Sequence, residues 1–219
     1  MTKELEKRIL SSLILIPICF YFIFKGAILF NLFLILCFII TSYEWHKMSK
    51  KKKYHLLGYI FLFISFYSAY MLRNHPVKGL GLFFFFLVII ICVFTDIGGY
   101  ISGNIFKGPR LNKISPNKTY SGMIGSYIFS IFAAYILINY SELLFKEKLN
   151  FNVNYFIFVI LISSISQIGD ISISFFKRLS KIKDTGKLIP GHGGILDRID
   201  GMIFAFPFSY LILQIGIIK

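Results

Sequence analysis

Long apolar runs separated by short basic connections are the feature that most limits how this chain can fold. Several of these runs approach the twenty or so residues that an α-helix needs to cross a bilayer, and the mean hydropathy of the chain is +0.72. Backbone groups inside hydrocarbon must form their hydrogen bonds within one segment, which favours helices. We therefore expect an all-α, polytopic integral membrane helix bundle, and the same runs exclude a soluble helical protein.

The apolar periodicity predicts about seven transmembrane helices. The expected spans, with ends uncertain by a few residues, cover 9–24, 26–43, 56–72, 79–99, 121–140, 151–176 and 200–218. We expect residues 1–78 to form a scaffold of N-terminal helices with a basic loop at 46–55. Residues 79–219 should form a second region of spans, whose polar loops lie on one side of the membrane and carry the candidate functional residues.

The basic residues predict the orientation of the spans. Lys and Arg outnumber Asp and Glu by 24 to 10. If the N-terminus is cytoplasmic, 18 of the 24 basic residues fall on the cytoplasmic side, as the positive-inside rule requires. The positive charge then indicates topology and contacts with anionic lipid, and no nucleic acid. We expect a multi-pass protein of the inner (plasma) membrane whose polar motif loops face the cytoplasm.

Several residues receive modest interpretations. Lys50–Lys53 are read as a topological and anchoring element in preference to a substrate site. Glu44, at the end of the second apolar run, is read as an interfacial residue. Cys19, Cys37 and Cys92 lie inside apolar runs without the spacing of metal ligands, and are read as buried packing residues.

Residues 170–200 are the most polar stretch, and they hold four of the five aspartates. Asp197 and Asp200 are three apart, so on a helix they share a face and could hold a cation together. Asp170 and Ser174 are four apart on the preceding span, so they also share a helix face. Carboxylates, basic side chains and a run of glycines form the composition that phosphoryl chemistry requires.

A second polar stretch, residues 95–122, begins with Asp96 at the end of an apolar run. Gly98, Gly99 and Gly103 predict close packing against a neighbouring helix. Downstream, Lys118 and Thr119 open the fifth span, where free N–H groups suit either an anion or a simple helix cap. The sequence leaves these two alternatives open.

Both stretches resemble the phosphatidate cytidylyltransferases (CDP-diacylglycerol synthases). The run from Ser174 to Asp200 fills every fixed position of that family's signature. The 95–122 stretch matches less fully, because Ile97, Asn117 and Ser121 depart from the family pattern. Ile173 also stands where the family often has Glu.

The resemblance implies the reaction CTP + phosphatidate → CDP-diacylglycerol + pyrophosphate, assisted by Mg²⁺ and a possible second metal ion. It implies that the metal is held by Asp170, Asp197 and Asp200, and that the catalytic groups also include Lys177, Arg178, Arg198 and Asp96. Substrate contacts are implied for Ser115, Lys118, Thr119, Ser174, Lys183, Asp184, His192, Gly193 and Gly194. Pairing of Arg178 and Arg198 with the aspartates remains an alternative to contact with phosphate.

Other functions stay open from the residues alone. A CTP-dependent membrane kinase for polyprenol or phytol would use similar charged loops but would transfer the γ-phosphate. A cation transporter would need acidic residues along a midplane path. The sequence defines no oligomeric state, and a homodimer is compatible with it.

Overall fold

In the computed structural model, every regular element among the described residues is an α-helix, which confirms the expected fold class. The structure describes residues 3–75, 80–111, 115, 118–189, 191 and 193–216, and the side chains from residue 13 on except that of Ala27. Two isolated β-bridges, Arg110 with Thr119 and Ile189 with Gly193, close turns within connecting segments.

Each of the seven predicted spans corresponds to a helix. Their bounds are α1 Lys3–Lys25, α2 Ala27–Ser49, α3 His55–Arg73, α4 Gly81–Phe106, α5 Tyr120–Asn139, α7 Val153–Leu179 and α9 Met202–Ile215. Two short helices, α6 Ser141–Phe145 and α8 Leu196–Ile199, lie in connections where no span was predicted.

Five helices are long and apolar enough to cross a membrane: α2, α3, α4, α5 and α7. Among the residues whose side chains the structure describes, the apolar stretches Leu13–Lys25 of α1 and Met202–Ile215 of α9 are shorter. Hydrocarbon about 30 Å thick needs roughly 20 helical residues. Length and composition therefore support five spans directly among the described residues, while the first and last predicted spans are confirmed as helices.

The chain forms two compact units that do not follow chain order. The first unit contains the residues up to Phe66 together with Phe176–Ile199. The second contains Tyr67–Phe175 and the residues from Asp200 on. The predicted division at residue 78 concerns roles, and it stays a prediction.

The second unit has an apolar core built from α4, α5, α7 and α9, with the end of α3. Phe83, Leu87, Ile91, Phe158 and Ile162 are fully buried in it. Cys92 is also buried, as expected, whereas Cys19 and Cys37 are only half-buried, and all three cysteines are free.

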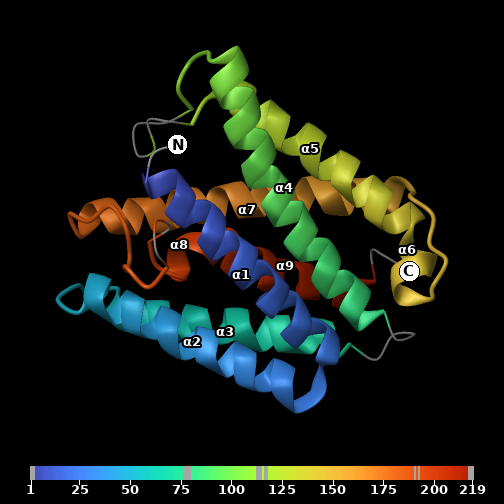
Figure 1. Ribbon diagram of the computed structural model, residues 1–219, viewed down its shortest axis with the longest axis horizontal. Coiled ribbons are helices and arrows are strands. Elements are labelled where there is room, and N and C mark those ends of the chain that lie inside the picture. Colours follow the sequence, from blue (N-terminus) through green and yellow to red (C-terminus); the bar gives the residue numbers. More distant parts are fainter. Residues whose placement is uncertain are drawn as a thin grey trace. The chain divides into compact units, whose positions relative to one another are not determined.

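Small residues bring α4 and α5 into close contact where the 107–119 connection joins them (Figure 1). A Cβ added to Gly98 would lie 2.5 Å from the Gly125 carbonyl oxygen, and one added to Gly122 would lie 2.8 Å from the Gly99 carbonyl oxygen. The predicted packing role of these glycines is confirmed. Helix α4 also continues to Phe106, so Asp96 lies inside the helix and not at its end.

Candidate active site

Between α7 and α8, the signature run forms a connection that we call the motif loop, and we define it by its described residues 180–189, 191 and 193–195. Asp197, at the start of α8, accepts hydrogen bonds from both arms of this loop. Thr185 and Gly194 donate backbone N–H groups to Asp197 Oδ2 at 2.8 and 3.0 Å. Lys177, at the end of α7, donates from Nζ to Asp197 Oδ1 at 2.9 Å. One carboxylate therefore ties together the end of a long helix and both arms of the loop.

These contacts also set the charge state of Asp197. Burial by itself raises the pKa of this carboxyl, because desolvation penalises the charged form. The hydrogen bond from Lys177, the backbone N–H of Gly194, the Lys177 charge and the backbone N–H of Thr185 together outweigh burial and hold the pKa below its ordinary value. Asp197 is therefore a carboxylate at neutral pH.

A second carboxylate, which the sequence did not assign to the site, holds the opposite side of the same loop. Glu44 on α2 is only 3% exposed. Its Oε1 accepts the Ile195 N–H at 3.0 Å, and its Oε2 accepts the Leu196 N–H at 2.8 Å and the Thr185 hydroxyl at 2.9 Å. The structure shows that Glu44 is buried within the protein, where donors from the motif loop and the start of α8 compensate its burial. A lone acid in an apolar run was the only sequence signal for this role.

The glycines of the motif loop make room for these carboxylates. A Cβ at Gly194 would lie 2.4 Å from Glu44 Oε2, and a Cβ at Gly186 would lie 2.7 Å from Glu44 Oε1. Gly193 has φ of +88°, a conformation that side chains disfavour, and a Cβ there would lie 2.8 Å from Asp197 Oδ2. These glycines are required by acidic side chains that approach the backbone closely.

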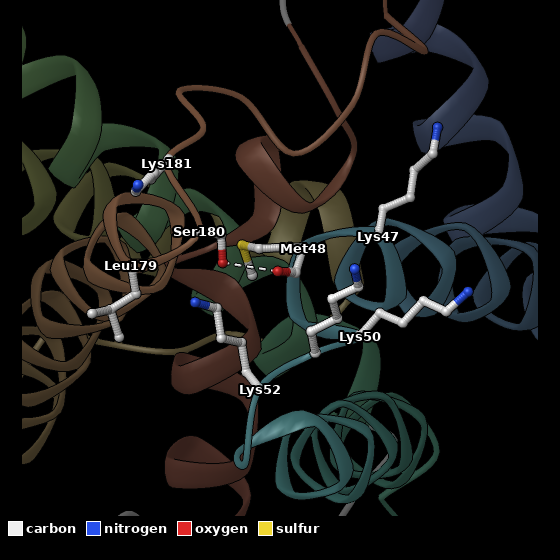
Figure 2. A pocket seen from close by; sticks show the side chains of 8 residues that line it. Lys47, Met48, Lys50, Lys52, Leu179, Ser180 and Lys181 are labelled. Carbon is white, nitrogen blue, oxygen red and sulfur yellow. Dashed lines mark hydrogen bonds between the residues drawn. The ribbon is translucent and has the colours of Figure 1, made fainter.

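Beside the motif loop lies a basic pocket of about 320 Å³, shown in Figure 2. Five lysines from two segments line it, together with Met48, Leu179 and Ser180; the lysines are Lys47, Lys50, Lys51, Lys52 and Lys181. Ser180 Oγ donates to the Met48 carbonyl oxygen at 2.8 Å and joins the two walls (Figure 2). Trp45, Tyr54 and Phe176 form an aromatic cluster in the same unit, with centroid distances of 4.8–5.9 Å.

The second unit carries a different lysine–aspartate pair. Lys118 Nζ lies 2.5 Å from Asp170 Oδ2, and the two side chains are 26% and 27% exposed. Ser174, one turn further along α7, donates to Asp170 Oδ1 at 3.3 Å. The structure thus brings together the two predicted motif stretches, 95–122 and 170–200, through Lys118 and Asp170.

Thr119 is the N-cap of α5, and its hydroxyl accepts the Gly122 N–H at 3.1 Å. The capping alternative left open by the sequence is therefore confirmed for Thr119. Lys118 immediately precedes this cap with its side chain directed at a carboxylate. The neighbouring predicted residue Ser115 is half-buried and lies in the same connection.

Two further predicted acids belong to the second unit. Asp200 is 8% exposed, and its Oδ1 accepts the Gly201 N–H at 2.9 Å. Asp96 lies on an exposed position of α4. Neither side chain is assigned a role by these placements alone.

The remaining predicted residues of the motif region are exposed. Lys183 and Asp184 project from the motif loop, and Arg198 lies on α8. Arg178 Nη1 donates to the Ile182 carbonyl oxygen at 3.5 Å. Within the described part of the chain, the ion pairs of Asp170 and Asp197 are made by lysines, not by Arg178 or Arg198. His192 lies outside the described residues.

The metal prediction concerns residues from both units, since Asp197 belongs to the first and Asp170 and Asp200 to the second. Among the described residues, no group of three or more His, Cys, Asp and Glu side chains is arranged to hold a metal ion. The chemistry of the aspartates still fits Mg²⁺, which prefers carboxylate oxygens. In Asp170 the fit requires exchange, because Lys118 and Ser174 contact its two oxygens.

The fold and these motifs define a class of polytopic membrane protein. Its polar segments contain lysine–aspartate pairs and a glycine-containing loop, a combination suited to phosphate-bearing substrates. The model of the cytidylyltransferase family matches residues 6–78 and 55–216. The chain belongs to this family.

Curated relatives agree with that assignment. The chain is 34% identical to a phosphatidate cytidylyltransferase of Rickettsia bellii over 213 residues, which cover 95% of this chain and 90% of the relative. It is 34% identical to the Rickettsia typhi protein of the same name over 209 residues, covering 93% and 89%. Identity to the Haemophilus influenzae phosphatidate cytidylyltransferase is 40% over 129 residues, covering 58% of this chain and 44% of that protein.

Proposed function

We propose that this protein is a phosphatidate cytidylyltransferase, a nucleotidyltransferase that converts CTP and phosphatidate to CDP-diacylglycerol and pyrophosphate. The observation that carries the proposal is similarity along nearly the whole chain to enzymes of that name. The filled signature from Ser174 to Asp200 supports the same assignment.

In this reaction, a phosphate oxygen of phosphatidate attacks the α-phosphorus of CTP, and the bond from that phosphorus to the pyrophosphate oxygen breaks. Phosphatidate is already an anion, so no strong general base is needed. The main barrier is electrostatic, because two polyanions must approach and charge builds on the leaving group. Cationic side chains near the reacting phosphates lower that barrier.

This chain supplies such cations as lysines paired with aspartates and as exposed basic side chains. Lys118, which is partly exposed beside Asp170, is suited to exchange from that carboxylate to a phosphate of CTP. Contact of the Gly193 and Gly194 backbone with the triphosphate is proposed from the family resemblance, and it would require adjustment of this backbone, because the Asp197 and Glu44 carboxylates lie beside these glycines. Lys177 is engaged with Asp197 and orders the motif loop, while Arg178, Lys183 and Arg198 are exposed and available for phosphate contacts.

Mg²⁺ held by Asp170, Asp197 and Asp200 would neutralise triphosphate charge and stabilise the departing pyrophosphate. Both oxygens of Asp197 accept hydrogen bonds from protein groups, so holding the ion would require exchange of a donor there, as at Asp170. Asp170 would contribute after Lys118 moves to substrate. Lys118 would then be available to bind a phosphate of CTP.

The membrane placement is part of the proposal. The excess of basic residues in the loops that carry both motifs supports a cytoplasmic active site. CTP is available on that side, and the proposal includes a location in the inner membrane.

Purified protein in mixed micelles with phosphatidate should transfer label from α-labelled CTP into lipid, and only with Mg²⁺. Transfer of γ-label in place of α-label would replace the proposal with a CTP-dependent lipid kinase. Absence of both labels from lipid, with the protein folded, would reject both enzymes.

A further inference from the structure

We propose that Glu44 is a positioning residue for the cytidylyl transfer: its buried carboxylate holds the motif loop in the form that receives CTP. This inference rests on the proposed function for its kinetic part. Its structural part, that Glu44 orders the loop, stands without that function.

The Glu44 carboxylate is buried. A carboxylate that is 3% exposed loses most of its hydration, so it is retained only where other groups replace the lost water. Glu44 has three such groups, and none comes from its own helix. Thr185 lies 141 positions away in the chain, and Leu196 lies 152 away. The contact therefore joins α2 to the motif loop and α8.

The donors to Glu44 come from the two arms of the motif loop and the start of α8. Thr185 follows Asp184 in the first arm of the motif loop, and Ile195 and Leu196 immediately precede Asp197 after its second arm. Glu44 thus grips both arms of the loop whose middle contains Gly191 and Gly193. The Thr185 hydroxyl lies 2.9 Å from Glu44 Oε2 and 3.0 Å from Asp197 Oδ2, so it stands between the two carboxylates.

The backbone of the motif loop packs directly against the Glu44 carboxylate. Gly186 and Gly194 leave no room for a Cβ beside the Glu44 carboxylate. Two glycines of the signature are therefore explained by a side chain that is not part of the signature. Loss of this support would let Asp197 and the glycine backbone move, and a misplacement of about 1 Å is enough to reduce a rate by roughly 100-fold.

The test uses the full-length protein in detergent. Glu44→Gln keeps the shape but turns an NH₂ group toward at least one backbone N–H, so the loop loses an acceptor. We expect kcat/KM for CTP to fall about 10- to 100-fold, with the KM for phosphatidate unchanged. Amide hydrogen exchange at Ile195 and Leu196 should become faster. Glu44→Asp, which retains the charge, should recover part of both effects.

A matched control lies one turn away on the same helix. Thr41 is fully buried like Glu44, but its hydroxyl donates only to the Cys37 and Phe38 carbonyl oxygens of α2. Thr41→Val should leave the CTP dependence and the exchange of the motif loop unchanged. If it matched Glu44→Gln in both readouts, the effect would belong to α2 in general and the inference would fail.

The loop side offers a variant that leaves α2 intact if Glu44→Gln does not fold. Thr185→Val should show the same loss for CTP and the same faster exchange, and Thr185→Ser should restore both. Wild-type exchange rates in Glu44→Gln or Thr185→Val would overturn the inference whether or not the protein makes CDP-diacylglycerol. If exchange rises as expected but wild-type protein incorporates no α-label, the proposed function fails and the ordering role of Glu44 survives.

Discussion

Two lysine–aspartate pairs lie in the polar part of this protein, and their surroundings differ. The Lys177–Asp197 pair in the first unit is nearly closed to solvent, with side chains 11% and 4% exposed. The Lys118–Asp170 pair in the second unit is open, with side chains 26% and 27% exposed. Asp197 also accepts hydrogen bonds from Thr185 and Gly194, whereas Asp170 also accepts one from the Ser174 hydroxyl.

The difference separates two uses of the same chemistry. A closed pair supported by backbone donors orders the chain around it, and removing one partner leaves an uncompensated buried charge. An open pair contributes little to stability, because water screens it, but its cation is available to an incoming phosphate. We therefore assign loop order to the first pair and substrate exchange to the second.

The largest expected effect is that of Asp197→Asn, which removes the charge that Lys177, Thr185 and Gly194 surround. Turnover should fall by at least about 100-fold, and stability should drop by about 3 kcal/mol because Lys177 loses its partner. Labelled-CTP incorporation and thermal inactivation in detergent measure the two effects. Asp170→Asn should lose turnover comparably but keep motif-loop amide protection, and equal loss of protection in both variants would erase the distinction between the pairs.

Next in size is Lys118→Ala, which should raise the KM for CTP roughly 10- to 100-fold, corresponding to the ~1.5–3 kcal/mol of a charged hydrogen bond. Thermal stability should change little, since the pair is open. Lys148→Ala, an exposed lysine in the connection between α6 and α7, removes the same charge elsewhere and should leave CTP dependence intact. An unchanged KM in Lys118→Ala would reject its role in binding phosphate.

A smaller effect concerns acid. The folded-state pKa of Asp197 lies below its ordinary value of about 4. The stability that this carboxylate contributes is therefore fully present above about pH 4 and is lost as the pH falls through the lowered pKa. Motif-loop hydrogen exchange followed at decreasing pH should accelerate only below about pH 4. Asp197→Asn should remove that acid step; its persistence would assign the step to another group.

The smallest effect should come from the basic pocket of Figure 2. Replacing any one of Lys50, Lys51 and Lys52 by Gln should weaken the dependence of activity on anionic lipid in proteoliposomes by about 5-fold, since each lysine near the surface contributes ~1 kcal/mol. Lys146 and Lys148, replaced by Gln, serve as the charge control. A loss as large as that of Lys118→Ala would move these lysines from anchoring to substrate binding.

Much of the fold followed from the sequence alone. Apolar runs of spanning length predicted the helices, because hydropathy and helical periodicity act over a few turns. The close packing of Gly98 and Gly99 against α5 was also predictable, since only small residues allow such approach. The signature from Ser174 to Asp200 identified the family before any geometry was known.

The composition of the site was only partly predictable. The sequence named Asp170, Lys118 and Asp197 but not which lysine pairs with which aspartate. It placed Asp96 at the end of a helix that in fact continues to Phe106. The shared metal role of the three aspartates remains a prediction.

What the sequence by itself determined is local: helices, turns of glycine and proline, and the residue types required by phosphate chemistry. What only the tertiary structure decided is the partnership of Glu44 with Thr185, Ile195 and Leu196. No periodicity joins residues some 140–150 positions apart. Only the folded chain brings this buried acid next to the donors that compensate its charge.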